Sequence, residues 1–126
     1  MKTSALILTA TVLFAIAPTP ASRADEKAEP PAKAQPVTIK GEVLDLGCYL
    51  DHGASGPKHA DCAQECIESG VPVGLLGEDG KVYLLLGEHK PLNKELAPFA
   101  GKTITLKGKL VTRSGVNLIE NVEVVK

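Results

Sequence analysis

Five strand-like stretches follow one another along the chain, with one helical segment before the fourth. The second and third are short apolar runs, whereas the first and fourth alternate apolar and polar residues. Such alternation is typical of half-buried β-strands, because successive side chains point to opposite faces of a sheet. The predicted strands cover Val37–Leu46, Val71–Leu76, Lys81–Leu86, Lys102–Thr112 and Val116–Val125. A chain with this pattern has to bury one face of each strand, which restricts it to a barrel or a sandwich.

The connections between these strands favour one of these two architectures. The second and third predicted strands are joined by Gly77-Glu78-Asp79-Gly80, whose glycines are typical of a β-hairpin turn. Residues Pro91–Phe99 carry apolar side chains at helical spacing and are followed by Gly101. Five strands with a helix between the third and fourth have the order of an OB-fold barrel, with a small β-sandwich as the alternative. We therefore predict a mainly β, five-stranded OB-fold-like barrel.

The long connection between the first and second predicted strands carries most of the reactive side chains. All three cysteines of the chain and two of its three histidines lie between positions 48 and 66. They are Cys48, His52, His59, Cys62 and Cys66. Thiolate and imidazole are the ligands that select zinc, copper or iron in proteins. This segment is the candidate functional site.

A helix is predicted over residues 58–69, because Pro57 suits its first turn and Gly70 suits its end. On a helical wheel of about 100° per residue, one edge holds three candidate ligands: His59, Cys62 and Cys66. The neighbouring arc, which we expect to be buried, holds Ala60, Ala63 and Ile67. Cys48, at the end of the first predicted strand, is placed to meet this edge, and His52 is a possible fifth ligand.

The three cysteines also have a simpler interpretation. In an exported protein they can form one disulfide and leave one free thiol. Cys62 and Cys66 are poor partners, because residues one helical turn apart have Cβ atoms about 5–6 Å apart and a disulfide needs about 3.5–4.5 Å. Cys48 can pair with either of them. His59 in register with both helical cysteines favours a metal site, since a disulfide has no use for an imidazole.

The N-terminal residues indicate an exported protein. Lys2 precedes an apolar run from Ala5 to Ala17 that is too short to span a bilayer, and Ser22 and Ala24 suit a cleavage site. A charged stretch rich in proline and alanine follows, which cannot bury enough surface to fold. We therefore expect a signal peptide over 1–24, a disordered linker over 25–36 and a folded domain over 37–126, with no membrane span after cleavage.

Composition excludes several functions. The chain has no tryptophan, two tyrosines, two phenylalanines and a net charge of −1, so it lacks the basic groove and stacking aromatics of a nucleic-acid-binding barrel. It has no haem-attachment motif, no phosphate-binding loop and no serine nucleophile motif. We do not expect an enzyme, and thiol redox chemistry at Cys62 and Cys66 is the only catalytic alternative retained.

The motif around the cysteines resembles that of a family of small exported bacterial proteins. Its residues are Asp45-Leu-Gly-Cys48-Tyr, His52-Gly, His59-x-x-Cys62-Ala-x-x-Cys66 and Gly70-x-Pro-x-Gly-Leu-Leu76. The resemblance covers about the whole mature domain and implies an OB-like barrel in the bacterial periplasm or secreted from the cell, with no established activity. Cys-x3-Cys beside a histidine is also similar to the copper ligands of exported chaperones of oxidase assembly, whose thioredoxin-like fold this chain does not share.

These patterns predict an exported domain that binds one transition metal through Cys48, His59, Cys62 and Cys66, with His52 as an exchangeable ligand. Thiolates favour Cu(I), and Zn(II) is the alternative. Metal storage, sensing or delivery to another exported metalloprotein suits such a thiolate-rich site. The alternatives are a disulfide-stapled structural or adaptor domain without metal and a thiol-redox protein.

Overall fold

The computed structural model describes residues 32–125, so the predicted signal peptide and residues 25–31 of the predicted linker lie outside the described part. Its elements are, in chain order, β1 (Gln35–Asp45), α1 (Leu46–His52), η1 (Pro57–His59), α2 (Ala60–Glu68), β2 (Val73–Gly77), β3 (Val82–Leu85), α3 (Asn93–Leu96), η2 (Ala97–Phe99), β4 (Thr103–Arg113) and β5 (Val116–Val124). The two η elements are single 3-10 turns. All five predicted strands are present, each within a few residues of its expected bounds.

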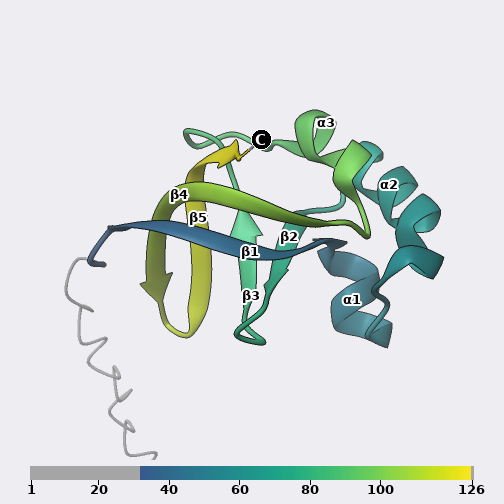
Figure 1. The fold of residues 1–126 in the computed structure, drawn as a ribbon, viewed down its shortest axis with the longest axis horizontal. Helices are drawn as coiled ribbons and strands as arrows, with labels where there is room; N and C mark the ends of the chain where they lie inside the picture. Colours follow the sequence, from purple (N-terminus) through teal and green to yellow (C-terminus); the bar gives the residue numbers. More distant parts are fainter. Residues whose placement is uncertain (1–31, 126) are drawn as a thin grey trace, which may run out of the picture.

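The strands close into a barrel in the order β1-β2-β3-β5-β4 (Figure 1). Neighbouring strands are antiparallel except β3 and β5, which are parallel. With helices between β1 and β2 and between β3 and β4, this confirms the predicted mainly β, five-stranded OB-fold-like barrel.

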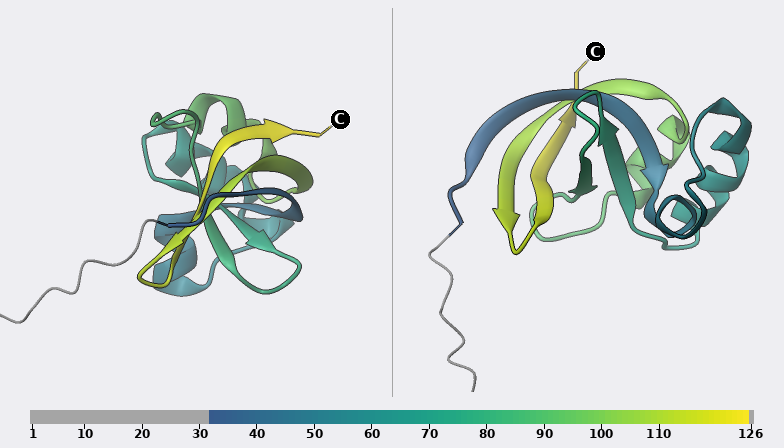
Figure 2. Two further views of the ribbon diagram at one scale, coloured as in Figure 1. Left: turned by 90° about the vertical axis from the view of Figure 1, so that its left-hand side faces the viewer. Right: turned by 90° about the horizontal axis from the view of Figure 1, so that it is seen from below.

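β1 closes the barrel because it pairs with β4 along its first part and with β2 along its last part. Figure 2 shows it arching across the barrel. Gly41 lies where both partners are present, opposite Gly77 and Ile104. A Cβ atom at Gly41 would collide with the carbonyl oxygen of Leu76, so glycine permits this close approach. The strand begins at Gln35, two residues before the expected start, and includes the end of the predicted linker.

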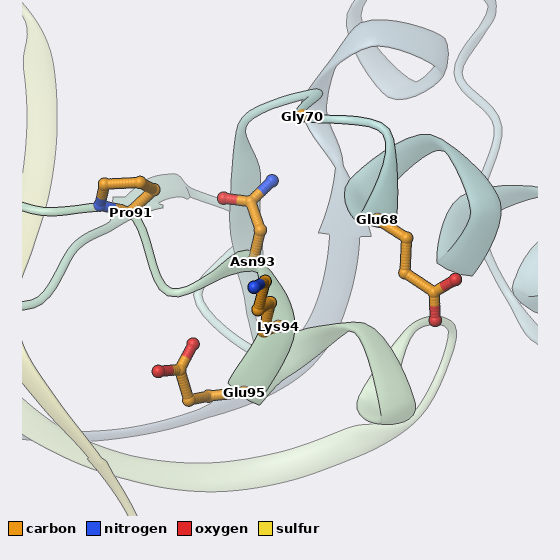
Figure 3. A pocket seen from close by; sticks show the side chains of 6 residues that line it. All are labelled: Glu68, Gly70, Pro91, Asn93, Lys94 and Glu95. Carbon is orange, nitrogen blue, oxygen red and sulfur yellow. The ribbon is translucent and has the colours of Figure 1, made fainter.

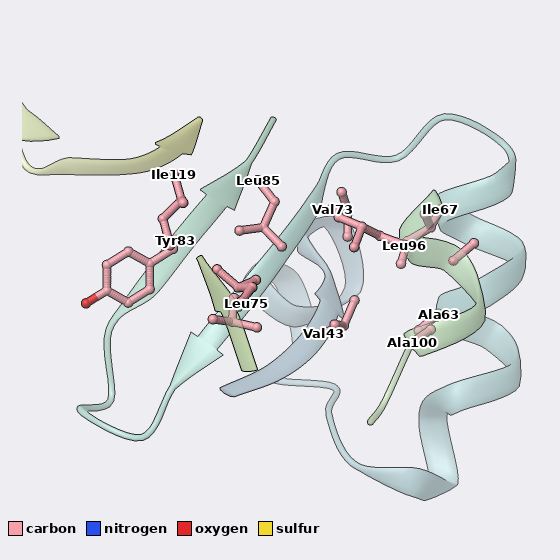
Figure 4. Close-up of a cluster of buried hydrophobic side chains, with 12 residues drawn as sticks. Val43, Ala63, Ile67, Val73, Leu75, Tyr83, Leu85, Leu96, Ala100 and Ile119 are labelled. Carbon is pink, nitrogen blue, oxygen red and sulfur yellow. The ribbon is translucent and has the colours of Figure 1, made fainter. Parts of the chain in front are cut away.

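The hydrophobic core runs from the barrel to the helices at one end (Figure 4). Buried strand residues include Val43, Val73, Leu75, Leu85, Leu106 and Ile119. The helical side contributes Ala63 and Ile67 of α2 together with Leu96, Ala97 and Ala100. Ala63 and Ile67 are buried as the helical wheel predicts, so α2 is fixed to the end of the barrel by its apolar face.

The two predicted helical segments are both present, divided between a 3-10 turn and an α-helix. The segment expected over 58–69 comprises η1 and α2, which ends at Glu68. Gly70 follows two residues later with a φ of +108°. The amide nitrogen of Asn93 in α3 donates to the carbonyl oxygens of Ile67 at 2.7 Å and Val71 at 2.8 Å. These bonds satisfy one carbonyl in the last turn of α2 and one in the loop that follows, and they connect the two helical segments.

One helix was not predicted. The first strand ends at Asp45 instead of Leu46, and α1 follows immediately. Oδ1 of Asp45 accepts from the backbone N–H of Cys48, and Gly53 ends the helix with a φ of +69°. Cys48 therefore lies in the first turn of a helix and not at the end of a strand. Among residues 32–125, none of the helices has the length and apolar character required to cross a bilayer.

Candidate metal centre

The three cysteines converge at one end of the barrel. Figure 1 shows α1 and α2, the helices that carry them, at this end. Cys48 comes from the first turn of α1, and Cys62 and Cys66 come from successive turns of α2. Their Sγ atoms all lie within 4.8 Å of one another, and all three thiols are free. Cys62 is exposed, whereas Cys48 and Cys66 are partly buried. We call these residues the three-thiol group.

A second group of candidate ligands shares Cys48 with the first. Its other members are Asp45 and His59, and one ligand atom of each residue lies within 4.8 Å of the others. Nε2 of His59 is 3.0 Å from Oδ2 of Asp45. The Asp45 side chain is 1% exposed and that of His59 is 20% exposed. We call Asp45, Cys48 and His59 the mixed group, because it offers an oxygen, a sulfur and a nitrogen.

Asp45 was not among the residues predicted for the site. A signal for it exists in the sequence, since an aspartate three residues before Cys48 has the spacing of an N-cap. Alternation continues through Leu46, however, and favoured a strand instead. The carboxylate therefore has two structural tasks: it caps α1 through Oδ1 and holds His59 through Oδ2.

The predicted four-ligand arrangement is divided between the two groups. Within the described residues, no group contains His59 together with Cys62 and Cys66. The reason is local: His59 lies in the 3-10 turn η1, before α2 begins at Ala60, so its direction does not follow the α-helical wheel. Its imidazole contacts Asp45 at the end of β1.

His52 belongs to neither group. It is the last residue of α1, its side chain is 70% exposed, and Nε2 lies 2.9 Å from Oδ2 of Asp51. The expectation that His52 reaches the cysteines therefore has no support in this geometry. The remaining histidine, His89, contacts Glu120 through Nδ1 at 3.2 Å.

The surroundings disfavour the thiolate form of two of the cysteines. A hydrogen bond to the Asp45 carboxylate, partial burial and the nearby negative charge of Asp45 raise the pKa of Cys48 to about 12. Burial and the neighbouring Cys66 raise the pKa of Cys62. A reactive catalytic cysteine needs a lowered pKa, and the direction for Cys48 and Cys62 is the opposite one. A cation that replaces these protons would relieve the electrostatic cost of forming thiolates together.

One surface pocket of about 310 Å³ lies elsewhere, beside the end of α2 and the start of α3 (Figure 3). It is lined by Glu68, Gly70, Pro91, Asn93, Lys94 and Glu95. None of the candidate ligands lines it. Asn93, its central polar residue, already donates to the carbonyl oxygens of Ile67 in α2 and Val71 in the following loop. The pocket is therefore separate from the metal centre.

Comparison with known proteins identifies no relative: the chain matches no protein family, no curated protein and no solved structure. The geometry of the two ligand groups is therefore the main guide to function. Both groups consist of residues that can hold a metal ion, and they adjoin each other through Cys48.

Proposed function

We propose that this chain is an exported metal-binding domain whose three-thiol group holds one soft cation. The observation that carries the proposal is the mutual approach of the three Sγ atoms within 4.8 Å. With metal–sulfur bonds of about 2.3 Å, two thiolates on one ion are about 3.8–4.0 Å apart at tetrahedral or trigonal angles. Small side-chain rotations would bring the sulfurs from the observed arrangement to that separation.

Three thiolates favour Cu(I), and Zn(II) is the alternative ion. A site formed by sulfur ligands leaves little room for a reactive water, which hydrolytic metal sites require. The exposed Cys62 lies at the edge of the group, where another protein could exchange the ion, while Cys48 and Cys66 are less accessible. These features support storage or delivery of the metal to another exported metalloprotein.

Export is supported by the N-terminal sequence and by the resemblance to small exported bacterial proteins. We propose cleavage after Ala24, which places the mature domain in the periplasm or outside the cell. N-terminal sequencing of protein recovered from outside the cytoplasm tests this directly. Retention of Met1 in that material would contradict it.

The metal proposal is tested by measuring bound copper and zinc per chain under reducing conditions. The wild type is expected to retain one Cu(I) in competition with a chelator of micromolar affinity. Cys62→Ser and Cys66→Ser, each of which leaves two of the three sulfur ligands, are expected to lose it. His89→Ala is the matched control, because His89 lies at Glu120 and belongs to neither ligand group. A wild type that binds neither ion, or variants that bind as well as the wild type, would reject the proposal.

A disulfide-stapled adaptor domain is the second candidate, and the same proximity of the sulfurs supports it. Cys48 comes from a different helix than Cys62 and Cys66, so it can pair with either. In that case the purified chain would titrate with one free thiol and carry no metal. Three titratable thiols after removal of metal by a chelator would favour the metal-binding domain.

A further inference from the structure

We infer that the mixed group of Asp45, Cys48 and His59 is a second cation position, so that Cys48 bridges two metal ions. This inference rests on the proposed function, because Cys48 also belongs to the three-thiol group. It adds an ion of a different chemical class, bound by oxygen and nitrogen in addition to sulfur.

The spacing of the nitrogen and oxygen ligands suits a shared ion. Nε2 of His59 and Oδ2 of Asp45 are 3.0 Å apart. Zinc binds nitrogen and oxygen at about 2.0–2.2 Å, which puts two such ligands about 3.3 Å apart at the tetrahedral angle. An ion could therefore take the position between these two atoms with movements of a few tenths of an ångström. Sγ of Cys48 completes three ligands within the same group.

The ligands are held in place by hydrogen bonds that an ion would not have to break. Oδ1 of Asp45 accepts from the backbone N–H of Cys48 at 2.7 Å, which leaves Oδ2 as the ligand oxygen. The backbone N–H of His59 donates to the carbonyl oxygen of Gly56 at 3.0 Å, and the N–H of Gly56 donates to Oε1 of Glu42 in β1. The turn that carries His59 is thus fixed to the strand that carries Asp45. Such fixed outer contacts are typical of metal sites.

The two groups differ in the ions they favour. Three sulfur ligands select Cu(I), whereas one carboxylate oxygen, one imidazole nitrogen and one thiolate form a borderline set that suits Zn(II). A thiolate sulfur has more than one lone pair and can bind two ions. We therefore expect copper at the three-thiol group and zinc at the mixed group.

The experiment loads the reduced, full mature chain with one equivalent of Cu(I), removes unbound copper and then adds Zn(II) at micromolar free concentration. Native mass spectrometry counts the ions per chain, and elemental analysis identifies them. One copper and one zinc per wild-type chain is the expected result. One copper without zinc would overturn the second position and leave the proposed function intact. Neither ion would overturn both.

Variants assign the zinc to its ligands. Asp45→Asn and His59→Ala are expected to lower zinc occupancy at least tenfold while copper remains at one per chain. Asparagine can still cap α1, so Asp45→Asn is expected to keep the fold, which circular dichroism checks. His89→Ala controls for zinc bound by a surface histidine beside Glu120 and is expected to keep both ions. Zinc that survives in His59→Ala, or disappears in His89→Ala, would show that the mixed group does not hold it.

Discussion

The backbone N–H of Cys48 donates a 2.7 Å hydrogen bond to Oδ1 of Asp45. Asp45 is therefore both the N-cap of helix α1 and a candidate metal ligand. The other carboxylate oxygen contacts His59, and the side chain is almost fully buried. The stability of the helical insertion, which is the segment from α1 to α2 between β1 and β2, therefore depends on the same carboxylate as the geometry of the candidate metal centre.

Asp45→Ala is expected to lower the free energy of unfolding of the reduced, metal-free protein by about 1–3 kcal/mol, because it removes a helix cap and a buried hydrogen bond. Asp45→Asn is expected to cost less, since its amide oxygen can still accept from Cys48. Urea denaturation of the two variants measures the difference. Equal losses in both variants would contradict the capping role.

The apolar face of α2 provides a second test. Ile67 is fully buried between α2 and the barrel, whereas Leu50 of α1 is 72% exposed. Ile67→Ala is expected to cost about 2–5 kcal/mol, because it leaves a cavity in the core. Leu50→Ala, also an aliphatic truncation, is expected to change stability by less than about 0.5 kcal/mol. Thermal and urea denaturation compare them, and a similar cost for both would show that α2 is not fixed as described.

The contact between α2 and the start of β4 depends on a glycine. Gly101 and Gly115 both have positive φ values, of +69° and +81°. A Cβ atom at Gly101 would lie 2.8 Å from Cβ of Ala60, whereas one at Gly115 would have nothing within 4 Å. Both alanine variants incur backbone strain of about 1–2 kcal/mol. Gly101→Ala is expected to cost more and also to weaken Cu(I) binding, because it displaces the start of α2.

Gly115→Ala is the matched control for that experiment. It is expected to reduce stability while leaving the Cu(I) affinity, measured by competition with a chelator, at the wild-type value. If the two variants bind Cu(I) equally, the close contact between Ala60 and Gly101 does not position the three-thiol group.

The barrel could be predicted because its signals are local. Alternation in the long strands, and apolar runs joined by a glycine turn in β2 and β3, located each strand to within a few residues. A helix before the fourth strand limited the topology. The burial of Ala63 and Ile67 also followed from one helical period. α1 could not be separated from β1 in this way, because the apolar pattern continues through Leu46 and the N-cap of Asp45 is a competing local signal.

The separation of the candidate ligands into two groups could not be predicted from the sequence, for a different reason. A wheel assigns one angular step to every residue, but η1 has a tighter turn than α2, so His59 departs from the direction of Cys62 and Cys66. Its partner, Asp45, lies at the end of a strand, and their contact depends on the path of the loop between them. Asp45 is the residue that sequence reasoning missed.

The hydrogen bond from Tyr83 to Asp79 makes stability depend on pH at the other end of the barrel. The hydroxyl donates to Oδ2 of Asp79 at 2.6 Å. Burial and this bond raise the pKa of Tyr83 to about 12, from an ordinary value of 10.0. A pKa that is raised on folding contributes stability that is complete below pH 10 and is lost as the pH rises through about 12. The unfolding free energy is therefore expected to fall over that range.

Asp79 gives the opposite dependence at acid pH. The hydrogen bond from Tyr83 lowers the pKa of Asp79, so its contribution is present above the ordinary value of 3.8 and is lost as the pH falls through the lower folded value. Tyr83→Phe is expected to weaken both effects. Urea denaturation across the two pH ranges, with tyrosinate absorbance at alkaline pH, provides the measurement. An unchanged pH dependence in Tyr83→Phe would assign the effects to other groups.

Metal binding is expected to stabilise the helical insertion more than the barrel. The three-thiol group joins α1 to α2, whereas β4 and β5 are held by their own pairing and contribute no ligand. At a free metal concentration of about 100 times the dissociation constant, binding adds about 2.7 kcal/mol to the native state. Because local openings of α1 and α2 must release the ion, their backbone amides should show the largest slowing of hydrogen exchange.

Hydrogen exchange followed by mass spectrometry, with and without one equivalent of Cu(I), measures this effect. Slower exchange is expected over residues 48–70, with smaller changes over β4 and β5. Cys62→Ser should lose the copper-dependent protection. His52→Ala should retain it, because His52 contacts Asp51 and belongs to neither ligand group. Loss of the copper-dependent protection in His52→Ala would restore His52 as a ligand. Protection confined to the strands would place the ion elsewhere in the molecule.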